Sequence, residues 1–400
     1  MVTEDFDVVV VGGGIQGLVL LRELSGEGYG CILVTKGPLG AGQTLHSHGA
    51  LISGMGLVTG ALSDTVEQTT VPYLRRLGVA VHRDDPALLL LPDAMVETVS
   101  GAWQAHGYRP RRTDPSVVPG LRTGAQSFRV PVANVERRRL VEALSLGLVP
   151  QILQAEVIGA DDGLRVRTVA GEVLHLRPRA VVVAAGCGTK GVLRHIFGVD
   201  GPPVERITYS RLHMLCLRAP SGVLPSVGAL VSPDLLVVGH QRDDGPDTGG
   251  AGVDWLVAPV DPSAVAHEEA PDDALADVDP HVVALAVERL KRLFPDMPDD
   301  DERVRAAVFA GYKQNVHGEQ LKPACELVDP DRNLVMALPS VLAHAVPNAR
   351  DAVALLRERN EPRGEVPDVP GRGEVAVAEP YEDSGPSWHD WGAVVRSAAG

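Results

Sequence analysis

The first thirty residues show the clearest pattern of apolar and small positions in this chain. Residues 8–11 are four valines, which favours a strand buried on both faces, as in a parallel sheet. Glycines follow at the spacing G-x-G-x-x-G, and apolar residues at 18–21 and 24 predict a helix directly after them. A strand, a glycine turn and a helix in this order predict a site for the pyrophosphate of a dinucleotide.

Each residue of this turn has a physical task. Gly12 permits the tight turn, Gly14 lets the backbone approach the phosphates, and Gly17 lets the helix pack closely on the strand. Ile15 and Gln16 begin the helix, whose N–H groups and dipole attract anions. We therefore expect these five residues to bind the phosphates.

The next apolar run, residues 31–34, predicts a second parallel strand. In dinucleotide-binding folds an acidic residue usually ends this strand and binds the ribose. Here Thr35 and Lys36 stand in that place. Thr35 can hydrogen-bond a ribose hydroxyl, whereas a neutral residue followed by a cation also suits a 2′-phosphate, so NADP remains an alternative.

The rest of the chain divides into helical and strand patterns. Apolar periodicity predicts helices over residues 65–77 (capped by Ser63 or Asp64 and divided at Pro72), 136–148, 281–294 and 349–357. Short apolar or alternating runs predict strands within residues 80–91, 155–169, 180–186 and 333–339. Mixed alternation over residues 205–260 predicts an antiparallel sheet, and residues 262–280 are expected to form a loop.

These patterns predict an α/β fold, with a Rossmann-like, three-layer parallel-sheet domain and an inserted antiparallel-sheet domain. We assign residues 1–80, 136–205 and 325–358 to the first domain, and residues 81–135 and 206–324 to a substrate domain. Residues 359–400 are rich in proline, glycine and glutamate, so we expect an extended or disordered tail. Trp388 and Trp391 would dock this tail on the body.

Composition narrows the class of protein. A formal net charge of -15 over 400 residues argues against nucleic acid and against an anionic membrane surface as partners. The four cysteines are far apart and form no C-x-x-C, which indicates buried free thiols in a reducing compartment. The acidic N-terminus lacks the basic region of a signal peptide, and no apolar run is long enough to span a membrane, so we expect a cytoplasmic protein.

A second glycine-rich segment, residues 40–49, carries candidate chemistry. Together with the opening motif it resembles the FAD-dependent D-amino-acid oxidase superfamily, which includes sarcosine oxidases, glycine oxidase and dimethylglycine dehydrogenase. The resemblance implies that Gln43, Thr44 and Ser47 lie along the flavin. Thr44-x-His46-x-x-Gly49 is similar to the T-x-H-x-x-G of the branch in which the histidine is bonded covalently to FAD.

By this resemblance His46 is the candidate attachment site. The alternative is a loop histidine that only hydrogen-bonds the flavin or a carbonyl. Leu45 stands where that branch commonly has tryptophan. His46 and His48 have no third ligand nearby in the sequence, so we expect no metal site.

Three later segments extend the resemblance in chain order. It implies that the strand containing Val157 meets the adenine and that Ala185 and Gly186 form a second FAD-contacting turn. It also implies that the segment containing Pro339 and Ser340 returns to the flavin.

Oxidation of an amine by a flavin requires a neutral amine and a cation for any substrate carboxylate. Tyr312 and Lys313 precede the C-terminal flavin segment and are our first candidates, although Lys313 could also be a solvated loop cation. Arg211 and His213 begin a strand over residues 212–217 and are the second pair. Alternation places His213 beside Leu215 and Leu217, which also suits a core histidine.

Two weaker candidates are His317 and Lys322. Overall, the sequence predicts an FAD-dependent oxidase or dehydrogenase acting on a C–N bond of a small amine or amino acid, with O2 or another electron acceptor. Oxidation of a 2-hydroxy acid or another C–O substrate, and a flavin subunit that needs a partner protein, remain alternatives. Ala337-Leu338-Pro339-Ser340 stands where aromatic hydroxylases and halogenases carry a Gly-Asp-Ala turn, and only 4% of residues are aromatic, which argues against those classes.

Overall fold

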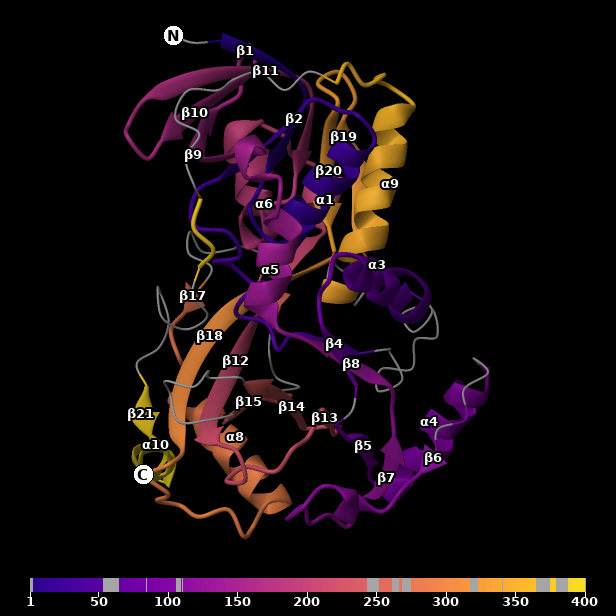
Figure 1. The fold of residues 1–400 in the computed structure, drawn as a ribbon, viewed down its shortest axis with the longest axis vertical. Coiled ribbons are helices and arrows are strands. Elements are labelled where there is room, and N and C mark those ends of the chain that lie inside the picture. The colour runs from indigo at the N-terminus through magenta and orange to yellow at the C-terminus, as the bar shows by residue number, and fades with distance from the viewer. Residues whose placement is uncertain are drawn as a thin grey trace.

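The computed structural model describes most of the chain with side chains. The described residues are 3–52, 65–83, 85–105, 109, 111–242, 252–260, 266–267, 275–316, 323–339, 341–364, 375–378 and 388–399. Two large sheets dominate them, one above the other in the view of Figure 1.

The first sheet is built around the strand of four valines. Val8–Val11 of β1 (Thr3–Val11) pair in parallel with β2 (Cys31–Thr35) on one side and with β11 (Val173–Val183) on the other. Val8 and Val10 belong to the core on one face, and Val9 and Val11 to the core on the other. The remaining strands are β9 (Ile152–Gly159), β10 (Leu164–Thr168), β19 (Ala324–Asp329) and β20 (Leu334–Leu338).

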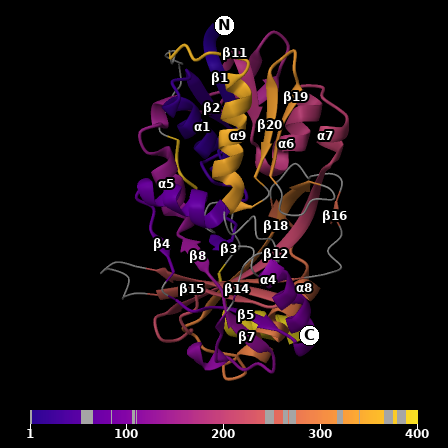
Figure 2. The same ribbon diagram turned by 90° about the vertical axis from the view of Figure 1, so that its right-hand side faces the viewer.

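Helices cover both faces of this sheet and make three layers (Figures 1 and 2). On one face lie α1 (Ile15–Gly26), α5 (Arg137–Ser145) and α9 (Ala345–Arg357). On the other lie α6 (Thr189–Gly191), the π-helical turn Val192–Ile196 and α7 (Pro202–Glu205). The predicted Rossmann-like arrangement is therefore confirmed.

The second sheet is mostly antiparallel. Its longest strands, β12 (Ile207–Pro220) and β18 (Arg305–Val316), pair over their full length and run up toward the first sheet (Figure 1). The strands that continue the sheet are β5 (Ala87–Leu91), β6 (Arg111–Arg112), β7 (Gln126–Arg129), β13 (Ala229–Val231), β14 (Leu235–Arg242), β15 (Gly252–Pro259), β16 (Ala266–His267), β17 (Leu275–Ala276) and β21 (His389–Asp390). A small sheet of β3 (Ala50–Ile52), β4 (Val81–His82) and β8 (Val132–Val135) lies beside them.

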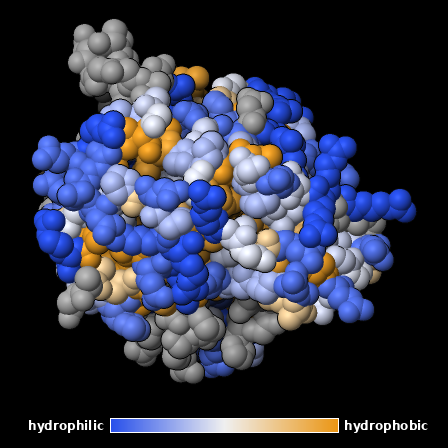
Figure 3. Space-filling model, turned by 90° about the horizontal axis from the view of Figure 1, so that it is seen from below, coloured by the Kyte–Doolittle hydropathy of each residue, from blue (hydrophilic) through white to orange (hydrophobic). Residues whose placement is uncertain are grey.

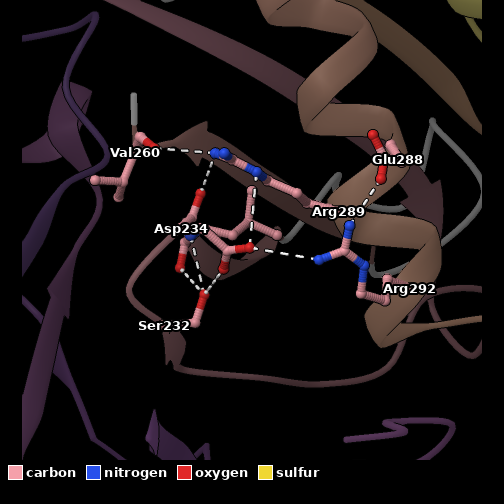
Figure 4. Close-up of polar contacts among 7 residues, drawn as sticks. Ser232, Asp234, Val260, Glu288, Arg289 and Arg292 are labelled. Carbon is pink, nitrogen blue, oxygen red and sulfur yellow. Dashed lines mark hydrogen bonds and ion pairs between the residues drawn. The ribbon is translucent and has the colours of Figure 1, made fainter. Parts of the chain in front are cut away.

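One face of the second sheet packs against α8 (Pro280–Leu293) and α10 (Trp391–Ala399). Arg289 fastens α8 by donating to the carbonyl oxygens of Asp234 and Val260, at 2.6 and 3.0 Å (Figure 4). From below, this end of the molecule shows a mainly hydrophilic surface broken by separate hydrophobic patches (Figure 3). In the described ranges, none of the helices has the length and apolar character needed to cross a bilayer.

Several boundaries differ from the sequence-based expectations. The helix expected over 65–77 is a π-helical turn, Thr65–Thr70, followed by α3 (Val71–Arg76), with Pro72 in the first turn of α3, where its missing N–H is tolerated. The expected caps Ser63 and Asp64 lie outside the described residues. Helix α4 (Asp93–Ala105) was not expected from the sequence.

Two expectations of irregular structure were wrong in part. Residues 262–280 contain β16 and β17, which form because β12 and β18 offer pairing partners. The tail contains β21 and α10, and burial of the Trp391 side chain holds that helix in place. The four cysteines are free thiols, as expected; Cys325 alone is partly exposed.

Candidate active site

The glycine turn between β1 and α1 excludes side chains. Gly12 has φ +124°, and a Cβ there would lie 2.4 Å from the carbonyl oxygen of Ala184. A Cβ at Gly17 would lie 1.8 Å from the carbonyl oxygen of Gly12. Gly14 is the N-cap of α1 and supplies no side-chain cap. The turn therefore presents bare backbone at the start of a helix, which is the arrangement that accepts phosphate groups.

A buried amide lies at the same place. Gln16 is 3% exposed, and its Nε2 has no hydrogen-bond partner in the described part of the chain. The next residue before it, Ile15, donates its backbone N–H to Thr44 Oγ1 at 2.9 Å. A buried donor without a partner is costly, so this site fits an anionic group that accepts from it, such as the pyrophosphate of FAD.

The segment 40–49 lies against this turn. The Gly40 N–H donates to the carbonyl oxygen of Gly13 at 2.9 Å. Arg137, the first residue of α5, donates to the carbonyl oxygens of Leu45 and Ser47 at 3.1 and 2.6 Å. The guanidinium of Arg137 thus fixes the backbone of the segment that carries the candidate flavin contacts.

The second sheet holds the same segment from its other side. His240 on β14 donates from Nε2 to the carbonyl oxygen of His48 at 2.7 Å, and the Ala50 N–H donates to His48 Nδ1 at 3.1 Å. Gly49 has φ +67°, and its Cβ position lies 3.1 Å from the His240 ring. Glycine is needed here because a side chain would push the ring away.

His46 lies between this segment and the second sheet. Its Nδ1 donates to the carbonyl oxygen of Gly42 at 2.9 Å, and its ring meets the edge of Phe309 on β18 at 5.5 Å between centroids. Since Nδ1 carries the proton in this bond, Nε2 is the nitrogen with the lone pair. Burial and the charge of Arg137 lower the pKa of His46, so the ring is neutral at pH 7.

The second glycine turn meets the same region. Gly186 follows β11 with φ +58°, and its Cβ position lies 3.4 Å from Gln43 Oε1. The thiol of Cys187 donates to the carbonyl oxygen of Tyr312 at 2.8 Å. The turn at Ala185 and Gly186 is thereby brought next to the segment of β18 that contains Tyr312 and Lys313.

Lys313 is the candidate residue that the fold brings closest to these groups. It follows Phe309 by four residues in β18, so the alternation of side chains places both on the same face of the sheet. Its charge lowers the pKa of both His48 and His344, in addition to the effect of their burial. Its ammonium makes no hydrogen bond or ion pair with any residue that the structure describes, and burial lowers its pKa.

The electrostatic environment of the site is positive. Burial is the largest cause that lowers the pKa of four histidines, and a nearby Arg137 or Lys313 lowers it further; the four are His46, His48, His240 and His344. The pKa of His48 falls to about 4 and that of His240 to about 3. Neutral imidazoles beside cations leave the site suited to an anion.

Other predicted site residues lie elsewhere. His213 accepts a hydrogen bond from the Asp279 N–H at 3.0 Å and lies on the face that carries Leu215 and Leu217 against α8, away from Lys313. This position corresponds to the core-histidine alternative. Arg211 stands opposite Tyr312 in the ladder, so both face away from Lys313.

The residues expected to contact the ribose and the adenine interact with other parts of the protein. The Thr35 hydroxyl donates to the carbonyl oxygen of Gly37 at 2.9 Å. Lys36 is exposed and pairs with Glu156 at 3.3 Å. Val157 is paired with Val166 of β10.

The end of β20 is next to the site. Pro339 follows that strand, and its carbonyl oxygen accepts a hydrogen bond from the Val341 N–H. Ser340, His317 and Lys322 lie outside the described residues.

Sequence reasoning missed four residues of the site: Arg137, His240, Phe309 and His344. Arg137 stands in a run of three arginines at a helix start, which looks like a solvated face. Phe309 lies between apolar neighbours, and His240 lies between Gly239 and Gln241 in no recognised motif, so neither carries a local signal. Only the pairing of distant segments gives them a role.

The fold and the site together define a dinucleotide-binding oxidoreductase with a second sheet over its cofactor segment. The family model described as "FAD dependent oxidoreductase" matches residues 7–337. The chain therefore belongs to the FAD-dependent oxidoreductases of the D-amino-acid oxidase family.

Individual relatives agree with this assignment. The probable FAD-dependent oxidoreductase PA4991 of Pseudomonas aeruginosa is 25% identical over 398 residues, covering 94% of this chain and 96% of the relative. Its crystal structure has a TM-score of 0.68 at 22% identity, over 94% and 97% of the two chains. Glycine oxidase from Geobacillus kaustophilus has a TM-score of 0.66 at 17% identity, over 90% and 96%.

A third similar structure is the L-alpha-glycerophosphate oxidase from Mycoplasma pneumoniae, described with FAD bound. Its TM-score is 0.69 at 18% identity, over 88% of this chain and 95% of that one. The three structures share the fold with this chain, although their names indicate different activities.

Proposed function

We propose that this FAD-dependent oxidoreductase oxidises a C–N bond of a small amine or amino acid. The observation that carries the proposal is Lys313, a half-buried ammonium with no partner in the described residues, on the face of the second sheet that also carries Phe309, whose ring contacts His46. Such a cation fits a substrate carboxylate, which accepts a charge-assisted hydrogen bond.

The geometry of the two glycine turns supports a set of proposed FAD contacts. Gly12, Gly14 and Gly17 leave room for the pyrophosphate, and the Gln16 amide is a donor for it. Thr35, Lys36 and Val157 are the proposed contacts on the adenosine side. Gln43, Thr44, His46, Ser47, Ala185, Gly186, Pro339 and Ser340 are the proposed contacts toward the flavin.

FAD, when bound, supplies the two-electron oxidation. The protein must hold the substrate amine uncharged, because a protonated nitrogen does not release a hydride from the adjacent carbon. Lys313 and Arg137 lower the pKa of the histidines around the site, and the same field favours the neutral form of a substrate amine. Lys313 is the proposed catalytic residue. Tyr312, Arg211 and His213 lie on the opposite face of the β12–β18 ladder, so we propose no direct contact with the substrate for them.

We also propose that His46 is bonded covalently to FAD. The bond from Nδ1 to Gly42 leaves Nε2 as the nucleophilic nitrogen. Acid precipitation decides between a linked and a dissociable cofactor. A wild-type pellet that stays yellow, and becomes colourless in His46→Ala, establishes the link; a colourless wild-type pellet overturns it.

The substrate class is tested by mixing the oxidised protein anaerobically with matched pairs, such as alanine against lactate and glycine against glycolate. We expect the amines to bleach the flavin and the hydroxy acids with the same skeleton to leave it oxidised. Bleaching only by hydroxy acids, or by glycerol phosphate, would assign C–O oxidation instead. If the pure chain is bleached by none of them but a partner protein restores turnover, the chain is a subunit.

We also propose the division into an FAD-binding domain (residues 1–80, 136–205 and 325–358) and a substrate domain (residues 81–135 and 206–324). Membership of the two large sheets supports it, since β1, β2, β9, β10, β11 and β20 fall in the first set and β5–β7 and β12–β18 in the second.

A further inference from the structure

The C-terminal segment after α9 touches three distant parts of the molecule. The first contact is at the loop between α1 and β2, where the Tyr29 hydroxyl donates to the carbonyl oxygen of Asn360 at 2.9 Å. There the Arg363 N–H donates to Asp7 at 2.8 Å. The match to the family model ends at residue 337, before this segment begins.

The second contact is on the cofactor segment itself. Leu39 donates its N–H to the carbonyl oxygen of Ala376 at 2.9 Å, and the Ala378 N–H donates to the carbonyl oxygen of Leu39 at 3.0 Å. The next residue, Gly40, donates to Gly13 in the glycine turn at 2.9 Å. Residues 375–378 are therefore two hydrogen-bonded steps from the backbone that cradles the pyrophosphate.

The side chains strengthen this contact. Val375 and Ala378 are 8% and 3% exposed, and they belong to the same core as Leu39 and Leu45. Ala376, between them, is exposed. The contact thus combines two backbone hydrogen bonds with the packing of apolar side chains against the segment that follows β2.

The third contact is on the second sheet. β21 pairs with the start of β18, and Trp391 is fully buried, with Nε1 donating to the carbonyl oxygen of Pro298 at 3.0 Å. Figure 1 shows α10 at the lower sheet, whereas α9, which precedes the tail, lies along the upper one. The tail therefore joins the two sheets that enclose the site.

We propose that residues 375–378 are a positioning element for the cofactor: they hold the segment 37–45 in the conformation that binds FAD. Attachment of residues 375–378 to Leu39 and binding of FAD are then coupled, so each strengthens the other. This inference uses only the FAD site and does not depend on the class of substrate.

The first test substitutes two residues that differ in side-chain burial. Ala378→Asp places a carboxylate in the core beneath Leu39, whereas Ala376→Asp places it in solvent. With apoprotein from riboflavin-limited cells, we expect Ala378→Asp to raise the Kd for FAD at least about tenfold, corresponding to about 1.4 kcal/mol. Ala376→Asp should change the Kd less than about twofold. Equal Kd values for Ala378→Asp and wild type would overturn the proposal.

The second test uses the wild-type chain, so it does not depend on whether a variant folds. Amide hydrogen exchange is measured with and without saturating FAD. We expect the Leu39 and Ala378 amides to exchange at least about tenfold more slowly with FAD, whereas the Trp391 amide, bonded to Val304 at the far anchor, should change much less. Equal changes at all three amides, or none at Ala378, would overturn the coupling.

Discussion

His240 on β14 donates a hydrogen bond of 2.7 Å to the backbone carbonyl oxygen of His48, so the second sheet directly holds the segment that carries the candidate flavin contacts. Arg137 holds the same segment from α5 by two bonds to its carbonyl oxygens. The conformation of residues 40–49 is therefore set by residues far from it in sequence.

The first prediction concerns pH. His48 and His240 have pKa values of about 4 and 3, below the value of an unfolded histidine, so the unfolded chain takes up protons that the folded chain does not. Their contribution to stability is complete above about pH 6.5 and is lost as the pH falls toward 4. We expect the Tm to drop between pH 7 and pH 5, and to drop less in His240→Asn.

His195→Asn, at an exposed histidine on the first sheet's side, is the matched control. A wild-type Tm that does not change over this range, or a slope that His195→Asn alters as much as His240→Asn, would contradict the assignment of this pH dependence to His240.

The second prediction concerns the glycine turn. Gly17→Ala would force a Cβ to 1.8 Å from the carbonyl oxygen of Gly12, so α1 must move away from the turn. We expect a loss of stability of about 1–3 kcal/mol or more and little bound FAD. The ratio of flavin to protein absorbance after purification measures the FAD, and urea unfolding measures the stability.

Gly26→Ala, at the far end of the same helix, is its control, because a Cβ there meets no described atom within 4 Å. This variant should retain its FAD and its unfolding midpoint. Loss of FAD in both variants to the same degree would show that the effect does not come from the close approach in the turn.

The third prediction concerns Lys313. Lys313→Met keeps the length of the side chain and removes the cation, so we expect FAD to remain bound while flavin reduction slows at least about tenfold and KM for a carboxylate substrate rises. Stopped-flow measurement of the two half-reactions checks this. Lys291→Met, at a lysine of α8 whose ammonium pairs with Asp299, should leave both half-reactions unchanged. Wild-type rates in Lys313→Met would remove Lys313 from the site.

The fourth prediction concerns the attachment of α8. Arg289 has a side chain 13% exposed and donates to two carbonyl oxygens. Arg289→Ala removes the donor to the Val260 carbonyl oxygen and one of two donors to that of Asp234, which still accepts from the Val260 N–H at 2.9 Å. We expect the free energy of unfolding to fall by about 1–3 kcal/mol in urea. Arg292→Ala, three residues away with a side chain 63% exposed, should change it by less than about 0.5 kcal/mol. Similar losses in the two variants would show that the buried hydrogen bonds are not decisive.

The sequence supplied what depends on neighbours along the chain. Four valines, three glycines and an apolar helix fixed β1, the turn and α1, since each of these rests on local conformation and on period. The resemblance of residues 40–49 gave the cofactor for the same reason, because it rests on residue types at a fixed spacing. The parallel and antiparallel sheets could likewise be told apart from continuous and alternating apolar runs.

Pairings between distant strands and segments were decided only by the tertiary structure. Alternation by itself could not say which face of β18 meets the segment 40–49. The ladder with β12 placed Lys313, a first candidate, and His213, from the second pair, on opposite faces. His240 and Arg137 act through backbone carbonyl oxygens, which carry no residue type for a sequence to display. The contact of Ala378 with Leu39 likewise joins residues more than three hundred positions apart, where burial of apolar surface and not local propensity sets the conformation.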